Sequence, residues 1–261
     1  MISDNSQYAG TAARLLGMRL SATSYDHTTD TVERWVLERH HGYICVCCVH
    51  MIMEGYEDSR LREAVNNADL VTTDGMPLVW YLRRHGFPNQ TRVYGPTLMP
   101  TLIARAEALG WRVGLYGGDQ DTLDRLVAKL HKDFPKLDLA YHWSPPFRTL
   151  TEEEIGQVRD DLRSAGVQLL FVGLGCPKQE FWMAEQAAHL PLIMVGVGAA
   201  FPFLAGTSPQ APSTLQKMGL EWLFRLAAEP RRLWKRYSTT VPKFIFLMLF
   251  PRFQKPAQRL D

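Results

Sequence analysis

Three predicted strands in this chain end in residues that could hold or act on a nucleotide. These ends are Asp74-Gly75, Gly117-Gly118 and Gly173-Leu174-Gly175. An apolar run that stops at glycine is typical of a buried strand that turns sharply into a helix. Glycine lets the backbone approach a ligand closely, and the start of a helix offers unpaired N–H groups to an anion. The pattern therefore predicts a phosphate or nucleotide site where these strand ends meet.

Asp74 is the acidic residue among these strand ends. Because the carboxyl ends of parallel strands share one edge of a sheet, Asp74 would stand beside the bound nucleotide. A carboxylate in that position could act as a general base that deprotonates an acceptor hydroxyl. Asp-Gly is also a common turn pair, and aspartate is a common helix N-cap. The local sequence alone favours this structural role.

Composition limits the classes of protein to which the chain can belong. The 261 residues are 46% hydrophobic and 21% charged, as in a globular protein, and a net charge of +2 does not favour nucleic-acid binding. Met1–Gln7 is polar and no apolar segment follows it, so we expect no signal peptide. No apolar stretch reaches about 18 residues, which argues against a transmembrane helix. The absence of a G-x-G-x-x-G fingerprint argues against a dinucleotide-dependent oxidoreductase.

The cysteines do not have the pattern of a metal site. Cys45, Cys47 and Cys48 lie within one predicted strand, where neighbouring side chains point to opposite faces. We interpret them as small buried residues in a reducing compartment. Cys176 lies in a glycine turn without an evident histidine partner, which does not favour a nucleophile. On this cysteine pattern we expect no bound metal and no other cofactor.

Predicted strands and helices alternate along most of the chain. Strands are expected at 43–49, 70–73, 111–116, 137–141, 168–172 and 192–197. Helices are expected at 31–40, 57–66, 76–85, 97–109, 120–134, 151–164 and 179–189. Thr151 and Glu154 have the spacing of a capping box. This order predicts an α/β fold with a mainly parallel, Rossmann-like sheet and helices on both faces.

The C-terminal segment from Gly219 differs from the rest. Its acidic residues are only Glu221, Glu229 and Asp261, whereas arginine and lysine recur throughout it. The apolar run Phe244–Phe250 is too short to cross a bilayer but suits an interfacial segment. We expect a basic helical appendage that binds an anionic membrane surface. The alternative is a terminal helix packed on the core with its basic residues facing water.

Several motifs occur in an order that resembles a known family of glycosyltransferases. They are Thr72-Thr-Asp-Gly-Met-Pro-Leu-Val-Trp80, Gly173-Leu-Gly-Cys-Pro-Lys-Gln-Glu180, Gly196-Val-Gly-Ala-Ala-Phe201, Gly219-Leu-Glu-Trp-Leu-Phe-Arg225 and Glu229-Pro-Arg-Arg-Leu-Trp-Lys-Arg-Tyr237. Together these motifs look like the WecG/TagA/CpsF family. The resemblance spans roughly residues 30–237.

The resemblance implies an inverting transfer of a hexose from a UDP-sugar to a polyprenyl-diphosphate-linked saccharide. It further implies a metal-independent enzyme of bacterial cell-surface polysaccharide synthesis. Such an enzyme would be cytoplasmic and peripheral on the inner face of the plasma membrane, with an arginine-bearing appendage that closes the active site. On this basis we expect an N-terminal extension at 1–29, a glycosyltransferase domain at 30–218 and the appendage at 219–261. The sequence indicates no oligomeric state.

The resemblance also assigns roles to individual residues. The family's proposed base falls on Asp74, its active-site arginine on Arg92 and its functional glutamine on Gln179. Its appendage arginines match the region of Arg225, Arg231, Arg232 and Arg236. Without a metal, guanidinium and helix N–H groups would stabilise the charge that develops on the UDP leaving group. We therefore count Gly117, Gly118, Gly173 and Gly175 with these residues as the predicted substrate site.

This chain departs from the family pattern at three places near the predicted donor site. The usual Thr-x-Asn is Val46-Cys47-Cys48, the usual Phe-Asp-Phe is Phe201-Pro202-Phe203, and the usual Ala-Pro-Arg-Trp is Ala211-Pro-Ser-Thr214. These departures leave the donor sugar open between an N-acetylmannosamine type and glucose. A non-catalytic nucleotide-sugar-binding protein of a polysaccharide assembly system is the alternative function. Asp74 and the arginine-rich appendage favour the enzyme.

Overall fold

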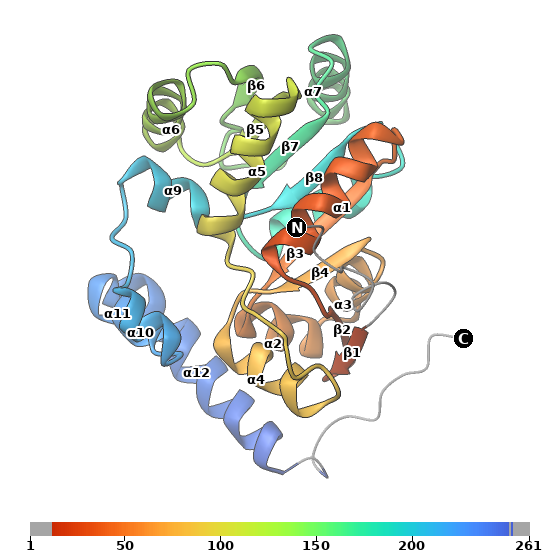
Figure 1. Cartoon of the computed structure of the whole chain (residues 1–261). Helices are drawn as coiled ribbons and strands as arrows, with labels where there is room; N and C mark the ends of the chain where they lie inside the picture. The colour runs from red at the N-terminus through yellow and green to blue at the C-terminus, as the bar shows by residue number, and fades with distance from the viewer. Residues whose placement is uncertain (1–11, 251, 253–261) are drawn as a thin grey trace.

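The computed structural model describes residues 12–250 and 252, and its centre is a six-stranded sheet (Figure 1). The strand order is β4-β3-β8-β7-β5-β6, and every neighbouring pair is parallel. The strands are β3 (Gly42–Cys47), β4 (Leu70–Thr73), β5 (Arg112–Gly117), β6 (Asp138–Trp143), β7 (Leu169–Gly173) and β8 (Ile193–Gly196). The predicted α/β fold with a parallel sheet is therefore confirmed.

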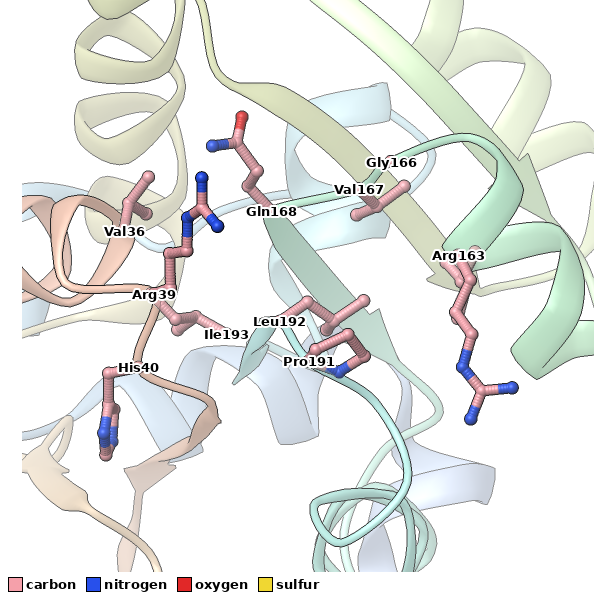
Figure 2. Close-up of a pocket in the computed structure, with 11 residues that line it drawn as sticks. Val36, Arg39, His40, Arg163, Gly166, Val167, Gln168, Pro191, Leu192 and Ile193 are labelled. Carbon is pink, nitrogen blue, oxygen red and sulfur yellow. The ribbon is translucent and has the colours of Figure 1, made fainter.

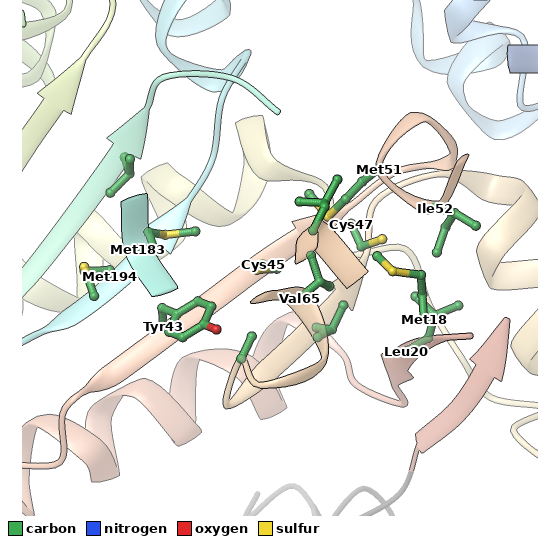
Figure 3. Packing of buried hydrophobic residues seen from close by; sticks show 14 of the residues in the cluster. Met18, Leu20, Tyr43, Cys45, Cys47, Met51, Ile52, Val65, Met183 and Met194 are labelled. Atoms are coloured by element: carbon green, nitrogen blue, oxygen red, sulfur yellow. The ribbon is translucent and has the colours of Figure 1, made fainter. Parts of the chain in front are cut away.

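The sheet is buried on both faces because its strands carry apolar side chains at successive positions. In β3, Ile44 and Val46 belong to one core cluster, whereas Cys45 and Cys47 belong to the other. Figure 3 shows Cys45 and Cys47 among Met51, Val65 and their neighbours. The cysteines of β3 are thus packing residues, as predicted, and Cys48 comes after the strand as the N-cap of the next helix.

Helices cover both faces of the sheet. The Ile44 face packs against α1 (Tyr25–Leu37), α5 (Gly95–Leu109), α6 (Gln120–Asp133) and α9 (Ala200–Ala205). The Cys45 face packs against α2 (Val49–Glu57), α3 (Ser59–Asn66), α4 (Met76–Arg84), α7 (Glu152–Ser164) and α8 (Lys178–Gln186). The capping box predicted at Thr151 is present, since Thr151 and Glu154 each accept a hydrogen bond from the other's backbone N–H.

A two-stranded antiparallel hairpin precedes α1. It consists of β1 (Ala12–Leu15) and β2 (Met18–Ser21). Leu15, Met18 and Leu20 are almost fully buried and belong to the same core cluster as Cys45. The part of the predicted N-terminal extension that the structure describes is therefore packed on the sheet domain.

Three helices follow α9 in the described part of the chain, and they are α10 (Ser213–Lys217), α11 (Glu221–Ala228) and α12 (Pro230–Leu249). The α12 helix packs beside α2 (Figure 1). Leu233, Phe244 and Leu247 on one face of α12 are buried, and the last two join the core cluster of α2. On the other face Trp234, Ile245 and Leu249 are exposed. The predicted helical appendage is present, and its apolar run divides between core and surface. Residues 251 and 253–261 of the predicted appendage lie outside the described residues.

Candidate active site

The predicted glycine ends meet at the carboxyl edge of the sheet. Gly117 ends β5 and Gly173 ends β7, and the N–H of Gly118 donates to the Gly173 carbonyl at 3.1 Å. A Cβ atom on Gly117 would lie 2.6 Å from the Gly173 carbonyl carbon, so only glycine allows this approach. Gly118 and Gly175 adopt positive φ angles of 74° and 77°, which glycine tolerates best. This edge therefore offers closely spaced backbone to a ligand, as the sequence predicts.

Asp74 follows β4 at the same edge and forms an ion pair with Arg92. Arg92 Nη2 donates to Asp74 Oδ1 at 2.8 Å, and Arg92 Nε donates to the Asp74 carbonyl. The segment that carries Arg92 runs along the end of β4, because the Val93 N–H donates to the Thr73 carbonyl at 2.9 Å. The structure therefore brings together the predicted base and the predicted active-site arginine, which stand 18 residues apart.

The environment of Asp74 suits a group that accepts a proton near neutral pH. Burial raises the pKa of Asp74 to about 6; the Arg92 charge opposes this increase and the Glu221 charge adds to it. One fifth of the Asp74 side chain remains exposed, so a substrate hydroxyl can reach it. A base is most effective when its pKa lies close to the working pH. Asp74 is thus ionised at pH 7 and more basic than an ordinary aspartate.

The buried side chain of Gln90 supports the residues that precede Asp74 and Arg92, a role that the sequence analysis did not identify. The residue is 1% exposed, and its amide oxygen accepts from the Thr23 N–H at 3.0 Å. Its amide nitrogen donates to the Thr23 carbonyl, the Thr73 hydroxyl and the Thr91 carbonyl at 2.7–2.9 Å. Thr73 precedes Asp74 and Thr91 precedes Arg92, so one buried amide fixes both neighbours of the ion pair.

The C-terminal helices contribute a second carboxylate to Arg92. Glu221, the first residue of α11, accepts from Arg92 Nη2 at 2.6 Å and from the Tyr94 hydroxyl at 3.1 Å. Gln216 of α10 accepts from Arg92 Nη1 at 3.2 Å. Neither residue stands out in the sequence, because each lies more than 120 residues from Arg92. A contribution of Arg92 to UDP binding stays a prediction.

Two of the predicted appendage arginines lie beside the body of the protein. The pKa of His50, at the start of α2, falls to about 4 because of burial and the nearby charges of Arg236 and Arg225. Arg225 also lowers the pKa of Asp74 and lies 5.3 Å from the centre of the Phe203 ring. Arg225 therefore lies near both His50 and Asp74, and together with Arg236 it forms a positive region around His50. The region is suited to a diphosphate.

The other two predicted appendage arginines, Arg231 and Arg232, lie in the first turn of α12. Arg231 is exposed. The side chain of Arg232 lies outside the described residues. The predicted contact of these two residues with UDP therefore stays a prediction.

Gln179 lies beneath the glycine turn after β7. It is 3% exposed; its amide oxygen accepts from the Gly175 N–H at 3.2 Å, and its amide nitrogen donates to Glu180 Oε1 at 2.7 Å. Burial raises the pKa of Glu180 to about 7. In this arrangement Gln179 supports the turn that presents Gly175. Direct contact between Gln179 and the donor stays a prediction.

Possible metal ligands do not gather in the described part of the chain. Among residues 12–250 and 252, no group of three or more histidine, cysteine, aspartate or glutamate side chains could hold a metal ion.

Burial raises the pKa of Cys176 far above its ordinary value, and this makes the thiolate scarce at neutral pH. The described helices also include none that is long and apolar enough to cross a membrane.

A cavity of about 320 Å³ lies at the opposite edge of the sheet (Figure 2). Its lining includes Val167 and Gln168, which precede β7, and Pro191 and Leu192, which precede β8. These residues mark the amino ends of the strands. The cavity is therefore separate from the edge that carries Asp74 and the glycine turns.

Comparison with known proteins identifies the family. The model of the glycosyl transferase WecG/TagA/CpsF family matches residues 13–258, which is nearly the whole chain. The chain belongs to this family. A relative from Bacillus spizizenii is 28% identical over 197 residues, which cover 75% of this chain and 74% of the relative. That relative is an N-acetylglucosaminyldiphosphoundecaprenol N-acetyl-beta-D-mannosaminyltransferase. The protein is accordingly a glycosyltransferase, and its Asp74–Arg92 pair is the candidate catalytic centre.

Proposed function

We propose that this WecG/TagA/CpsF protein transfers a hexose from a UDP-sugar to a polyprenyl-diphosphate-linked saccharide in bacterial cell-surface polysaccharide synthesis. The observation that carries the proposal is Asp74, a carboxylate at the edge of the sheet with a pKa of about 6. The relative's name supports the acceptor class, since that enzyme acts on a diphosphoundecaprenol-linked sugar. A protein that only binds nucleotide sugars would not need a carboxylate of this basicity.

Asp74 performs the proton transfer in the proposed reaction. Arg92 binds Asp74 Oδ1, and this contact orients the carboxylate so that Oδ2 can accept the proton of the acceptor hydroxyl. The hydroxyl oxygen attacks the anomeric carbon as the bond to the UDP oxygen breaks, which inverts the configuration. The electron pair of the broken bond remains on UDP.

Arg225 and Arg236 stabilise the leaving group in this scheme. Both charges lie near His50, and that of Arg225 also lies near Asp74. The burial that raises the pKa of Asp74 also strengthens their interaction with a developing phosphate charge. We propose that these side chains take the electrostatic role that a divalent cation has in other sugar-nucleotide enzymes. No cofactor is then required.

The outer face of α12 is the proposed membrane contact. Trp234, Ile245 and Leu249 expose between half and about two thirds of their surface, and Lys235 and Arg231 are exposed beside Trp234. Apolar and aromatic side chains flanked by basic residues suit the headgroup region of an anionic leaflet. A polyprenyl acceptor stays in the bilayer, so this contact would place the enzyme at the cytoplasmic face where the acceptor lies.

A donor screen tests the proposed reaction. The full chain would be incubated with a short-chain polyprenyl-diphosphate N-acetylglucosamine and either UDP-N-acetylmannosamine or UDP-glucose, and the lipid product would be weighed by mass spectrometry. We expect the mass of one hexose or N-acetylhexosamine to be added, together with one equivalent of UDP released. UDP release without any lipid product, or no reaction with any UDP-sugar, would contradict the proposal.

A further inference from the structure

Arg92 connects three separate parts of the chain through one guanidinium group. Its Nη2 donates to Asp74 Oδ1 after β4 and to Glu221 Oε2 at the start of α11. Its Nη1 donates to Gln216 of α10. Two carboxylates therefore share one positive charge, and the C-terminal helices reach the candidate base through it.

Glu221 is held in place by more than the ion pair. Its second oxygen accepts from the Tyr94 hydroxyl, and the Arg92 guanidinium lies 3.9 Å from the centre of the Tyr94 ring. Only 15% of the Glu221 side chain is exposed. A hydrogen-bonded charge pair with so little exposure is screened much less than a surface pair. The contact is thus strong enough to affect the groups around it.

We propose that Glu221 is a positioning residue that fastens the C-terminal helices to Arg92 and sets how strongly Asp74 holds a proton. The inference rests on the proposed function, in which Asp74 is the base. In this role Glu221 competes with Asp74 for Arg92 and places a second negative charge near it. When the C-terminal helices dock on Arg92, the same contact therefore makes Asp74 a stronger base.

The sign of the effect follows from the charges around Asp74. The ionisable neighbours that interact with it come from α1, the β3–α2 junction, the Arg92 segment and α11, and they are Tyr25, Cys47, Cys48, Arg92, Tyr94, Glu221 and Arg225. Of these, Glu221 is the other carboxylate, and its charge raises the pKa of Asp74. When the Glu221 charge is removed, Asp74 is the one carboxylate that remains paired with the Arg92 charge. Asp74 then becomes more acidic and a weaker base.

The test is a comparison of Glu221→Gln with the wild-type full chain. Glutamine keeps the shape and can still accept from Arg92, so only the charge is lost. We expect the acidic limb of the pH profile of kcat, near pH 6 in the wild type, to move down by about one pH unit. We also expect the plateau rate above pH 7 to fall. Glu152→Gln, at an exposed position of α7, is the matched control and should leave the profile unchanged.

A loss of packing alone would give a different result. It would lower the rate at every pH and leave the acidic limb in place, and that outcome overturns the inference. A second measurement does not depend on turnover. The Asp74 carboxyl can be titrated by ¹³C NMR in carboxyl-labelled protein, with Asp74→Asn to assign its resonance. An unchanged titration in Glu221→Gln would refute the role of Glu221 even if no UDP-sugar were transferred, whereas absence of transfer alone would refute the proposed function.

Discussion

Replacement of Gln90 by leucine removes the amide that supports both neighbours of the Asp74–Arg92 pair. The buried Thr23 backbone, the Thr73 hydroxyl and the Thr91 carbonyl together lose four contacts with the Gln90 amide. A buried polar group that loses its partner costs about 1 kcal/mol or more. Because an amide NH2 carries two hydrogens and Thr91 is exposed to water, these contacts amount to about three buried hydrogen bonds. We therefore expect Gln90→Leu to lower the free energy of unfolding by about 3 kcal/mol, which is a large fraction of the roughly 5–15 kcal/mol that is typical of a folded domain.

Urea denaturation followed by circular dichroism measures this change. The control is Gln157→Leu, because Gln157 is exposed and its amide contacts only the surface side chain of Asp161 at 2.7 Å. The control should change the free energy of unfolding by less than about 0.5 kcal/mol. Equal midpoints for Gln90→Leu and the wild type would show that the buried amide does not hold this segment, and the reasoning would be refuted.

Two further predictions concern the leaving group and the membrane. Because Arg225 and Arg236 are proposed to balance the UDP charge, transfer should continue at the same rate in EDTA; a rate that vanishes and returns with Mn²⁺ would contradict this. Serine at Trp234, Ile245 and Leu249 together should weaken binding to anionic vesicles at least about tenfold in a flotation assay. Serine at the exposed Leu37 and Leu109 is the control, and equal binding by both variants would refute the membrane face.

Local signals in the sequence predicted most of the sheet domain. The Thr151–Glu154 capping box formed because its two hydrogen bonds join residues three positions apart. The glycine turns were predictable because their backbone angles need glycine. Asp74 was placed correctly at the edge of the sheet because the parallel order fixes where each strand ends. Its role as a base, as opposed to a turn residue, came from the resemblance.

Short or ambiguous patterns hid other elements. The hairpin of β1 and β2 has strands of only four residues, too short to show a period. The strand predicted to end at residue 49 ends at Cys47, and α2 begins at Val49 with Cys48 as its N-cap. An unbroken apolar sequence gave no sign of this boundary, since both a buried strand and a buried helix accept such residues.

Contacts between distant residues account for what the sequence could not predict in the site. Gln90 has a role in the site because the fold places it against Thr23, and Glu221 has one because the fold places it against Arg92. The division of Phe244–Phe250 between core and surface depends on where α12 packs. Tertiary packing decides each of these roles, so no local pattern marks them.

The turnover of Asp74→Asn is the most direct test of the claim that Asp74 is the base. Asparagine keeps the shape of the side chain and removes its ability to accept the proton. We expect kcat for hexose transfer to fall by about 10²- to 10⁴-fold, with UDP affinity within about threefold of the wild type. Asp121→Asn, on the exposed start of α6, serves as the control and should retain full activity. Near-normal turnover in correctly folded Asp74→Asn would contradict the account.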